Sequence, residues 1–391
     1  MMVAMRRSWS RTHRSRALSQ TYVCSVMIWC ATRHFTSHGA SAYTMHPSFS
    51  ALLNHADSYD AFILDQFGVL HNGVEALPGA IDCVEALHKA GKQLIVLSNT
   101  SAPAKAALAK LPKFGFTKEC FRDAVTSGEE AAKHLAATYQ DGQAALFLTW
   151  DTSLGPNNPR LTATPQQFLE KCQPTNGRGI QVAESLDSAQ LVLCHGSEVW
   201  YRGDKQEDVP LTNFITEGSF VEAVDPLLQS CVQRKLPMVC ANPDHVVVTP
   251  SGDGVAHMPG KIAQRYKDLL HESLLNEGQT NEKAQQQVSE LCKIFGKPHV
   301  EHFQACLQRL GVSPDRVAHV GDSLHHDIAG ANACGIDSIL ITNTGIHARD
   351  LGVVTPSSTL AELLIPDQDR LDALLEKEGI IPTHVVPAFR M

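Results

Sequence analysis

The sequence lacks any apolar run that could cross a bilayer. A membrane-spanning helix needs about 18 consecutive apolar residues, and the 391-residue chain has no run of that kind, although 43% of it is hydrophobic. The apolar content is enough for a large buried core, and the length is typical of two or three domains. We therefore expect a globular protein that does not span a membrane.

Cysteine patterns typical of metal binding or redox chemistry are also missing. The eleven cysteines include no CxxC pair and no cysteine–histidine spacing suited to zinc. Cys194 and Cys240 lie inside apolar runs, which indicates buried thiols in a reducing compartment. A basic balance is absent too, because the formal net charge is −8, and this argues against a general nucleic-acid binder.

Acidic residues are absent from the first 45 positions, which hold six arginines and many serines and threonines. This composition is typical of a presequence that directs a protein to mitochondria or another organelle. Three other interpretations remain open: a signal peptide with Tyr22–Ala31 as its apolar part, a disordered segment, or a translation start at Met45. Without a genuine presequence, we expect the protein in the cytoplasm.

Beyond this leader, continuous apolar runs alternate with helical patterns, which predicts an α/β fold with a parallel sheet. Predicted strands lie at Ala61–Asp65, Gln93–Ser98, Arg316–Gly321 and Ser338–Thr342. A middle stretch has strands of its own at Ala144–Thr149, Leu191–His195 and Pro237–Ala241, so we expect a second α/β domain inserted into the first. The predicted boundaries are a leader at 1–45, a discontinuous core at 46–123 and 259–365, an inserted domain at 124–258 and a C-terminal tail at 366–391.

Four short polar patterns follow predicted strands or open a helix. They are Asp65-Gln66-Phe67-Gly68-Val69-Leu70, Ser98-Asn99-Thr100, Gly296-Lys297-Pro298, and Gly321-Asp322 with Asp327 five residues further on. Because the carboxyl ends of parallel strands converge on one crevice, we expect the four patterns to meet there. Each pattern alone has an ordinary explanation as a turn or helix cap, so only their joint order supports a site.

The side chains in these patterns suit phosphoryl transfer. Asp65, Asp322 and Asp327 would repel one another if they lay together, and a divalent cation with Lys297 would offset them. Ligation by oxygen atoms alone favours Mg²⁺. A carboxylate nucleophile, a metal, a lysine and the hydroxyl of Ser98 are the groups that such a reaction needs.

The order of these motifs resembles the haloacid dehalogenase superfamily, and more narrowly its class IIA (NagD-type) branch, which includes pyridoxal phosphate and p-nitrophenyl phosphatases. The resemblance covers about residues 57–347, and it implies a Rossmann-like core with a large inserted α/β cap of the C2 type. It also implies that Asp65 is the nucleophile, that Lys297 neutralises the phosphate, and that Asp327 holds Lys297 or a metal-bound water. The implied metal ligands are Asp65, Asp322, Asp327 and the backbone carbonyl of Phe67, and the expected contacts to phosphate and substrate are Ser98, Asn99, Thr100, Asn242 and Asp244.

One position departs from the pattern of the superfamily. Its general acid/base is a second aspartate two residues after the nucleophile, and this chain has Phe67 there. Such proton transfer is typically worth about 10²–10⁴ in rate. Three outcomes stay open: substrates with good leaving groups, His71 as a substitute acid, or a protein that binds phosphorylated ligands without turning them over. An aromatic residue here is also similar to the haloalkanoate dehalogenases, an interpretation that ranks lower because those enzymes lack the metal.

We thus expect a Mg²⁺-dependent hydrolase of the phosphatase type that acts on a small phosphorylated metabolite through an aspartyl-phosphate at Asp65. The alternative is a catalytically weak protein that binds phosphorylated ligands. We expect neither a nucleic acid nor a membrane as partner. The sequence leaves a homo-oligomer open and does not reveal which metabolite is the substrate.

Overall fold

The structure is a computed structural model that describes residues 43–391 except 56–58, 154, 156–157, 159–160, 162, 250–253 and 354–363. The leader predicted at 1–45 therefore lies outside the described residues apart from its last three. Tyr43 is buried in an apolar cluster of the core, and Thr44–Met45 forms the edge strand β1. The folded part of the chain thus begins slightly earlier than expected.

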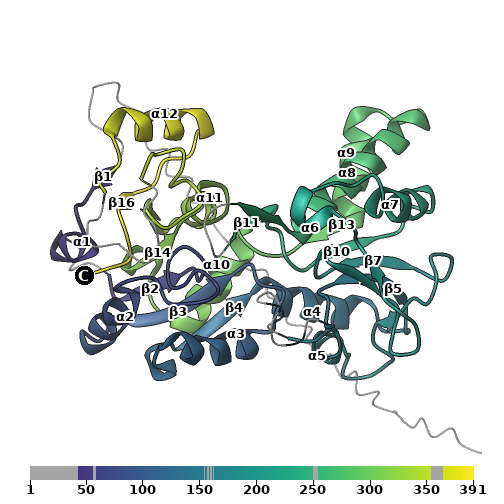
Figure 1. Cartoon of the computed structure of the whole chain (residues 1–391), viewed down its shortest axis with the longest axis horizontal. Coiled ribbons are helices and arrows are strands. Elements are labelled where there is room, and N and C mark those ends of the chain that lie inside the picture. The colour runs from purple at the N-terminus through teal and green to yellow at the C-terminus, as the bar shows by residue number, and fades with distance from the viewer. Residues whose placement is uncertain are drawn as a thin grey trace, which may run out of the picture. The chain divides into compact units, whose positions relative to one another are not determined.

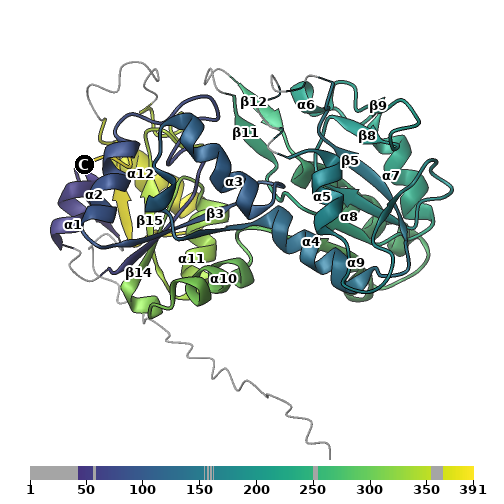
Figure 2. The same cartoon turned by 90° about the horizontal axis from the view of Figure 1, so that it is seen from below.

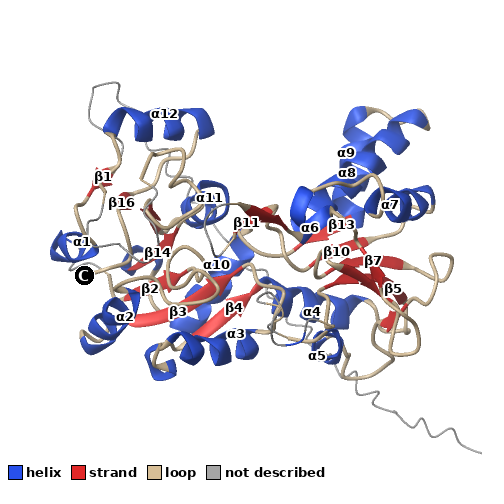
Figure 3. Ribbon diagram, in the orientation of Figure 1, coloured by secondary structure: helices blue, strands red, loops and turns tan. Residues whose placement is uncertain are grey.

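The core is one parallel sheet, as the alternation of apolar runs and helices predicts. Its strands stand in the order β1 (Thr44–Met45), β16 (His384–Val386), β15 (Asp337–Ile341), β14 (Val317–Gly321), β2 (Ala61–Leu64), β3 (Gln93–Ser98) and β4 (Asp123–Thr126). Every neighbouring pair is parallel (Figure 3). The strands at the centre are continuous apolar runs because helices cover both of their faces.

Alternate residues of β2 face opposite helical layers. Phe62 and Leu64 pack in the cluster that contains α1 (Phe49–His55), α2 (Ala80–Lys89) and α3 (Ala104–Lys110). Ala61 and Ile63 pack with α10 (Val300–Leu310) and α11 (Ala329–Cys334). The last helix, α12 (Gln368–Glu378), packs against β15 and β16. This two-fold periodicity fixes the register of the central strand.

The inserted domain, called the cap below, has a mixed sheet of its own. Its strands are β13 (Cys292–Ile294), β10 (Met238–Cys240), β7 (Leu191–Cys194), β5 (Ala144–Thr149), β8 (Val199–Tyr201) and β9 (Val209–Pro210), with β6 (Gln181–Val182) beside β5. One face is covered by α4 (Ser127–Thr138) and α5 (Pro165–Lys171), and the other by α6 (Phe214–Glu217), α7 (Val224–Gln233), α8 (Pro259–Asn276) and α9 (Asn281–Leu291). A hairpin of β11 (Val246–Val248) and β12 (Val255–His257) lies between the two sheets (Figures 1 and 2).

The structure corrects three of the expected domain boundaries. The cap begins at α4 because β4, up to Thr126, pairs with β3 in the core sheet. It ends at Ile294 rather than at residue 258, because α8 and α9 pack in the cap and β13 pairs with β10. Residues 366–391 are not a separate tail, since β16 is a strand of the core sheet.

The two halves of the core sheet meet at β2 and β14. The chain proceeds from β2 outward through β3 and β4, and later from β14 outward through β15 and β16. The carboxyl ends of these two strands therefore form the switch point where open α/β sheets bind ligands. Within the part of the chain that the structure describes, no helix has the length and apolar character needed to cross a membrane.

Candidate active site

Asp65 stands at this switch point, directly after β2. Only 8% of the residue is exposed, and its Oδ1 lies 2.8 Å from the Nζ of Lys297. Burial raises the pKa of the carboxyl to about 7; the positive charge of Lys297 opposes this increase, and repulsion from Asp327 adds to it. Its ionised form therefore depends on the cation beside it.

Lys297 is held rigidly in the loop between β13 and α10. Its backbone N–H donates to the Oδ1 of Asn99 at 2.7 Å. The preceding Gly296 has φ 123°, and a Cβ there would lie 2.6 Å from the same Oδ1. Glycine is needed for both the backbone conformation and the close approach, which accounts for the Gly296-Lys297 motif.

Asp327 joins Lys297 to a histidine beneath the site. It is 1% exposed, and its Oδ1 accepts a hydrogen bond from the Nζ of Lys297 at 2.7 Å and lies 2.7 Å from the Nε2 of His319. Burial alone would raise the pKa of Asp327, but the charges and hydrogen bonds of Lys297 and His319 hold it below its ordinary value. Likewise, burial would lower the pKa of Lys297, and the two carboxylates instead hold it above its ordinary value.

Asp322 follows β14 and closes the group from the other side. Its Oδ2 accepts a hydrogen bond from the N–H of Ile346 at 2.9 Å. Gly68, with φ 74°, lets the loop after Asp65 pass so close that a Cβ there would lie 2.5 Å from the same oxygen. Burial, with repulsion from Asp327 and Asp65, raises the pKa of Asp322 well above its ordinary value.

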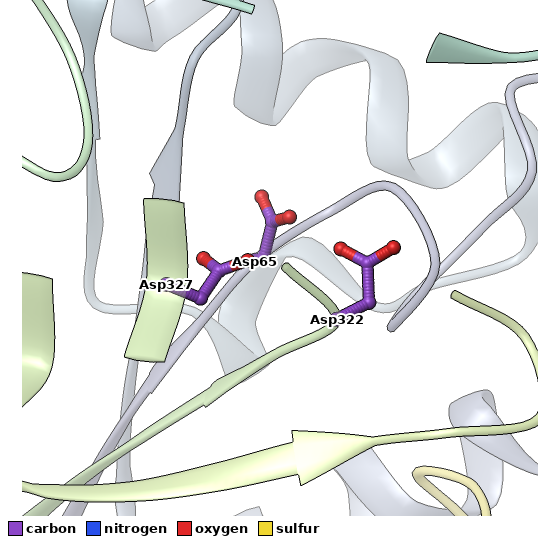
Figure 4. Close-up of side chains that lie close together, drawn as sticks. All are labelled: Asp65, Asp322 and Asp327. Atoms are coloured by element: carbon purple, nitrogen blue, oxygen red, sulfur yellow. The ribbon is translucent and has the colours of Figure 1, made fainter. Parts of the chain in front are cut away.

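The three carboxylates point toward a common space (Figure 4). Asp65, Asp322 and Asp327 each offer an oxygen, and these oxygens lie within 4.8 Å of one another. Lys297 is the lysine that is paired with two of them, so the group carries an excess of negative charge. An all-oxygen donor set with this charge fits a small divalent cation.

The residues expected to contact phosphate or substrate divide into two sets. Ser98 and Thr100 lie at the end of β3, where both line the same cavity as Asp65. The side chain of Asn99 is occupied by the protein itself, since its Nδ2 donates to the Oδ1 of Asp244 at 2.7 Å and its Oδ1 accepts from Lys297. Asn99 and Asp244 therefore join the core to the cap at the edge of the site.

Asn242 is buried as well, and its Oδ1 accepts from the N–H of Asp244 at 3.0 Å. It lines the cavity. Its carbonyl oxygen also accepts from the thiol of Cys240. These contacts indicate that Asn242 shapes the cap loop, and its expected contact with substrate stays a prediction.

His71 lies close to the site, in a buried environment that disfavours its protonated form. Its ring is 3% exposed and lies between the rings of Phe67 and Phe114, with centroids 5.4 and 4.3 Å away. Its Nδ1 accepts from the N–H of Gly73 at 3.1 Å. Burial, with a smaller contribution from Lys110, lowers the pKa of His71 to about 3. The low pKa argues against His71 as the replacement for the missing acid, because an imidazole in this environment is neutral at neutral pH, and its catalytic role stays a prediction.

The polar cluster opens into a cavity of about 600 Å³ between the core and the β11–β12 hairpin of the cap. Asp65, Lys297 and Asp322 lie on the core side, together with the half-buried Phe67. Val246–Val248 of β11 line the cap side. The space is of the size that small-molecule ligands occupy.

Comparison with known proteins finds matches in the segments that carry these residues. A model of haloacid dehalogenase-like hydrolases matches residues 62–153, and a second model of such hydrolases matches residues 294–363. These two segments contain Asp65, Ser98, Lys297, Asp322 and Asp327, and the first extends into the cap as far as residue 153. A 4-nitrophenylphosphatase of Schizosaccharomyces pombe is 23% identical over 312 residues, which cover 75% of this chain and 87% of that protein. Both segments of the core are thus similar to haloacid dehalogenase-like hydrolases.

Two other similarities are more limited. A phospholysine phosphohistidine inorganic pyrophosphate phosphatase of Xenopus laevis is 27% identical over 85 residues, which cover 20% of this chain and only 32% of that protein. A solved structure from Cytophaga hutchinsonii, described as a possible sugar phosphatase, superposes with a TM-score of 0.58 at 19% identity over 89% of this chain and 99% of its own. This likeness shows the fold, with its Rossmann-like core and inserted cap.

Two contributors to the site were not expected from the sequence. His319 lies in the middle of β14, where an apolar residue would be ordinary, and its pairing with Asp327 follows only from the fold. Trp150 reaches the cavity from the end of β5, where its Nε1 donates to the Oγ of Ser101 at 3.0 Å. A histidine within a buried apolar strand was the one available signal for His319, because a buried imidazole needs a partner.

Proposed function

We propose that this protein is a Mg²⁺-dependent phosphatase that hydrolyses a small phosphomonoester through an aspartyl-phosphate at Asp65. The observation that carries the proposal is the buried carboxylate of Asp65, paired with Lys297 and flanked by two further aspartates at the opening of a cavity. The similarity to a 4-nitrophenylphosphatase supports the same class of reaction.

The residues around Asp65 fit a magnesium ion. Asp65, Asp322 and Asp327 would hold it, and the carbonyl of Phe67 is a further ligand that we propose. Burial, with repulsion from neighbouring carboxylates, raises the pKa values of Asp65 and Asp322, which supports the proposal that a cation binds here. When bound, Mg²⁺ withdraws charge from the phosphate oxygens and keeps the carboxylates ionised.

The chain supplies the remaining steps with its own side chains. An ionised oxygen of Asp65 attacks the phosphorus atom, the bond from phosphorus to the ester oxygen breaks, and its electron pair leaves with that oxygen. Lys297 stands within 2.8 Å of Asp65 and can donate to a phosphate oxygen, as can the hydroxyl of Ser98. Water then attacks the phosphorus of the aspartyl-phosphate, which releases phosphate and restores Asp65.

Phe67 motivates the second candidate, a protein that binds phosphorylated ligands with little turnover. Without an aspartate at this position, neither the departing oxygen nor the attacking water has the usual proton partner. The pKa of His71, which burial lowers to about 3, argues against this histidine as a substitute proton donor.

The experiment that separates the two candidates measures release of 4-nitrophenol from 4-nitrophenyl phosphate by the purified full chain. We expect turnover that requires Mg²⁺, stops with a chelator, and is absent from the Asp65→Asn variant. Asp60→Asn, an exposed aspartate before β2 that pairs with Arg316, is the matched control. Tight binding of phosphate esters without turnover would favour the second candidate. Turnover that survives both the chelator and Asp65→Asn would exclude the proposed mechanism.

A further inference from the structure

We propose that the leaving group of the substrate is an aromatic alcohol, so that the protein is selective for apolar aryl phosphates over alkyl and sugar phosphates. The inference rests on the proposed phosphatase function and concerns the part of the cavity beyond the phosphate. Three features carry it: an aromatic wall on the core side, an apolar wall on the cap side, and the lack of a proton donor for the departing oxygen.

The wall on the core side contains the rings of Phe67 and His71, with Phe114 packed behind His71. Phe67 lines the cavity and contacts His71 edge to face, and His71 in turn packs on Phe114 with its ring inclined by 33°. The Nζ of Lys110 lies 5.7 Å from the centroid of Phe114. In the superfamily pattern an aspartate occupies the position of Phe67, so this chain has replaced a charged group beside the ester oxygen with an aromatic surface.

The wall on the cap side is aliphatic. Val246–Val248 of β11 line the cavity, and Met258 lies beside them at the start of α8. Trp150 also lines it, with its indole nitrogen already bonded to Ser101. These side chains offer a planar, apolar leaving group a surface on which its burial is favourable.

The charged and titratable side chains that line the cavity away from Asp65 are Lys110, Asp244, His245, His325, His326 and His347. Among the described residues no arginine lines the cavity, although arginine is the residue best suited to bind a second phosphate or a carboxylate. The carboxylate that lies on the cap side, Asp244, already accepts a hydrogen bond from Asn99.

The chemistry of the leaving group also favours an aromatic alcohol. When Asp65 attacks phosphorus, the electron pair of the breaking bond stays on the ester oxygen. A phenolic oxygen carries this charge in its ring and takes its proton from water after it has left. An alkoxide is far more basic and needs a proton during departure, and such assistance is typically worth about 10²–10⁴ in rate. A site with Phe67 in place of the acid thus discriminates against alkyl esters by that factor.

The test compares kcat/KM for three substrates with Mg²⁺: 4-nitrophenyl phosphate, acetyl phosphate and glycerol phosphate. Acetyl phosphate has a good leaving group but no ring, and glycerol phosphate has neither. We expect 4-nitrophenyl phosphate to exceed acetyl phosphate by about 10- to 100-fold, the gain that burial of a ring provides. Glycerol phosphate should be slower than 4-nitrophenyl phosphate by about 10³-fold or more, since it lacks both advantages.

Variants test separately the missing proton donor at Phe67 and the apolar wall formed by β11. Phe67→Asp should bring the rates of the alkyl and aryl esters at least 10-fold closer together. Val246→Thr/Val248→Thr keeps the shape of β11 but adds hydroxyls, and it should raise KM for 4-nitrophenyl phosphate several-fold more than KM for acetyl phosphate. Val255→Thr is the matched control, because Val255 pairs with Val248 from β12 and is exposed.

Equal kcat/KM for glycerol phosphate and 4-nitrophenyl phosphate would overturn the inference and leave the proposed function intact. So would equal kcat/KM for acetyl phosphate and 4-nitrophenyl phosphate, because the apolar walls would then contribute nothing. Failure to turn over any of the three substrates would instead contradict the proposed function itself.

Discussion

The environment of His71 predicts how the stability of the protein depends on pH. The folded protein holds this ring neutral with a pKa of about 3, whereas the ordinary value is 6.5. Below pH 6.5 the unfolded chain therefore binds a proton that the folded protein does not bind. The stabilising effect of the neutral ring is fully present above pH 6.5 and is lost as the pH falls toward 3.

The size of the effect follows from the shift in pKa. One unit corresponds to about 1.4 kcal/mol, so the whole shift amounts to about 5 kcal/mol. Lowering the pH from 6.5 to 5 crosses about 1.5 units in which the unfolded histidine is protonated and the folded one is not. The expected loss of stability from this residue is therefore about 2 kcal/mol at pH 5. His71→Asn removes the titrating group and retains an acceptor for the N–H of Gly73.

The measurement is urea unfolding of the wild type and of His71→Asn at pH 7.5 and at pH 5. We expect the wild type to lose about 2 kcal/mol more than the variant between the two pH values. The exposed His88 supplies the control substitution, His88→Asn. An equal loss in the wild type and in His71→Asn would refute the argument, because it would mean that His71 is protonated in the folded protein and remains a candidate acid.

Three further predictions concern the charged group and the junction with the cap. Lys297→Met leaves buried carboxylates without their cation, and we expect urea unfolding to show that the free energy of unfolding falls by about 3–5 kcal/mol. The control Lys133→Met removes an exposed ion pair and should lower it by at most about 1 kcal/mol. Mg²⁺ at about 100 times its dissociation constant should stabilise the protein by about 3 kcal/mol in thermal unfolding. Asp322→Asn should abolish most of this gain in stability. An equal gain in the variant would exclude Asp322 as a ligand. Gly128→Ala would place a Cβ 1.9 Å from the carbonyl oxygen of Ser101, so calorimetry should show a destabilisation of about 1–3 kcal/mol or more; an unchanged midpoint would show that α4 can shift freely.

The core sheet could be predicted because each of its central strands has a recognisable local sequence pattern. Runs such as Ala61–Leu64 and Gln93–Ser98 are continuous, apolar and short, which is the pattern of a strand covered on both faces. The site followed from them, since Asp65 and Asp322 stand where two such strands end. The family resemblance then supplied the roles of these residues, which composition and spacing alone do not give.

The end of the cap could not be predicted in the same way. Pro259 opens a helix just as Pro298 precedes one, so the sequence alone does not distinguish a cap helix from a core helix. The strand β13 has three residues and is recognisable only by its pairing with β10. Long-range pairing of this kind depends on the tertiary fold and leaves little local signal.

The surroundings of individual side chains were also beyond the sequence. His71 was a candidate acid until its packing between Phe67 and Phe114 was known. Asn99 was a candidate phosphate ligand, and its side chain proved to bridge Lys297 and Asp244. Phe67 is near His71 in the sequence, but Phe114 and both partners of Asn99 are distant along the chain, and no local pattern identifies them.

The role of Asp65 as nucleophile is tested most directly by trapping the phosphorylated protein. The full chain would be mixed with 4-nitrophenyl phosphate and Mg²⁺, quenched in acid within the first turnover, digested and analysed by mass spectrometry. We expect one added phosphoryl group on the peptide that contains Asp65, and none in the Asp65→Asn variant. A phosphoryl group on a different side chain, or wild-type turnover by Asp65→Asn, would contradict the proposed mechanism.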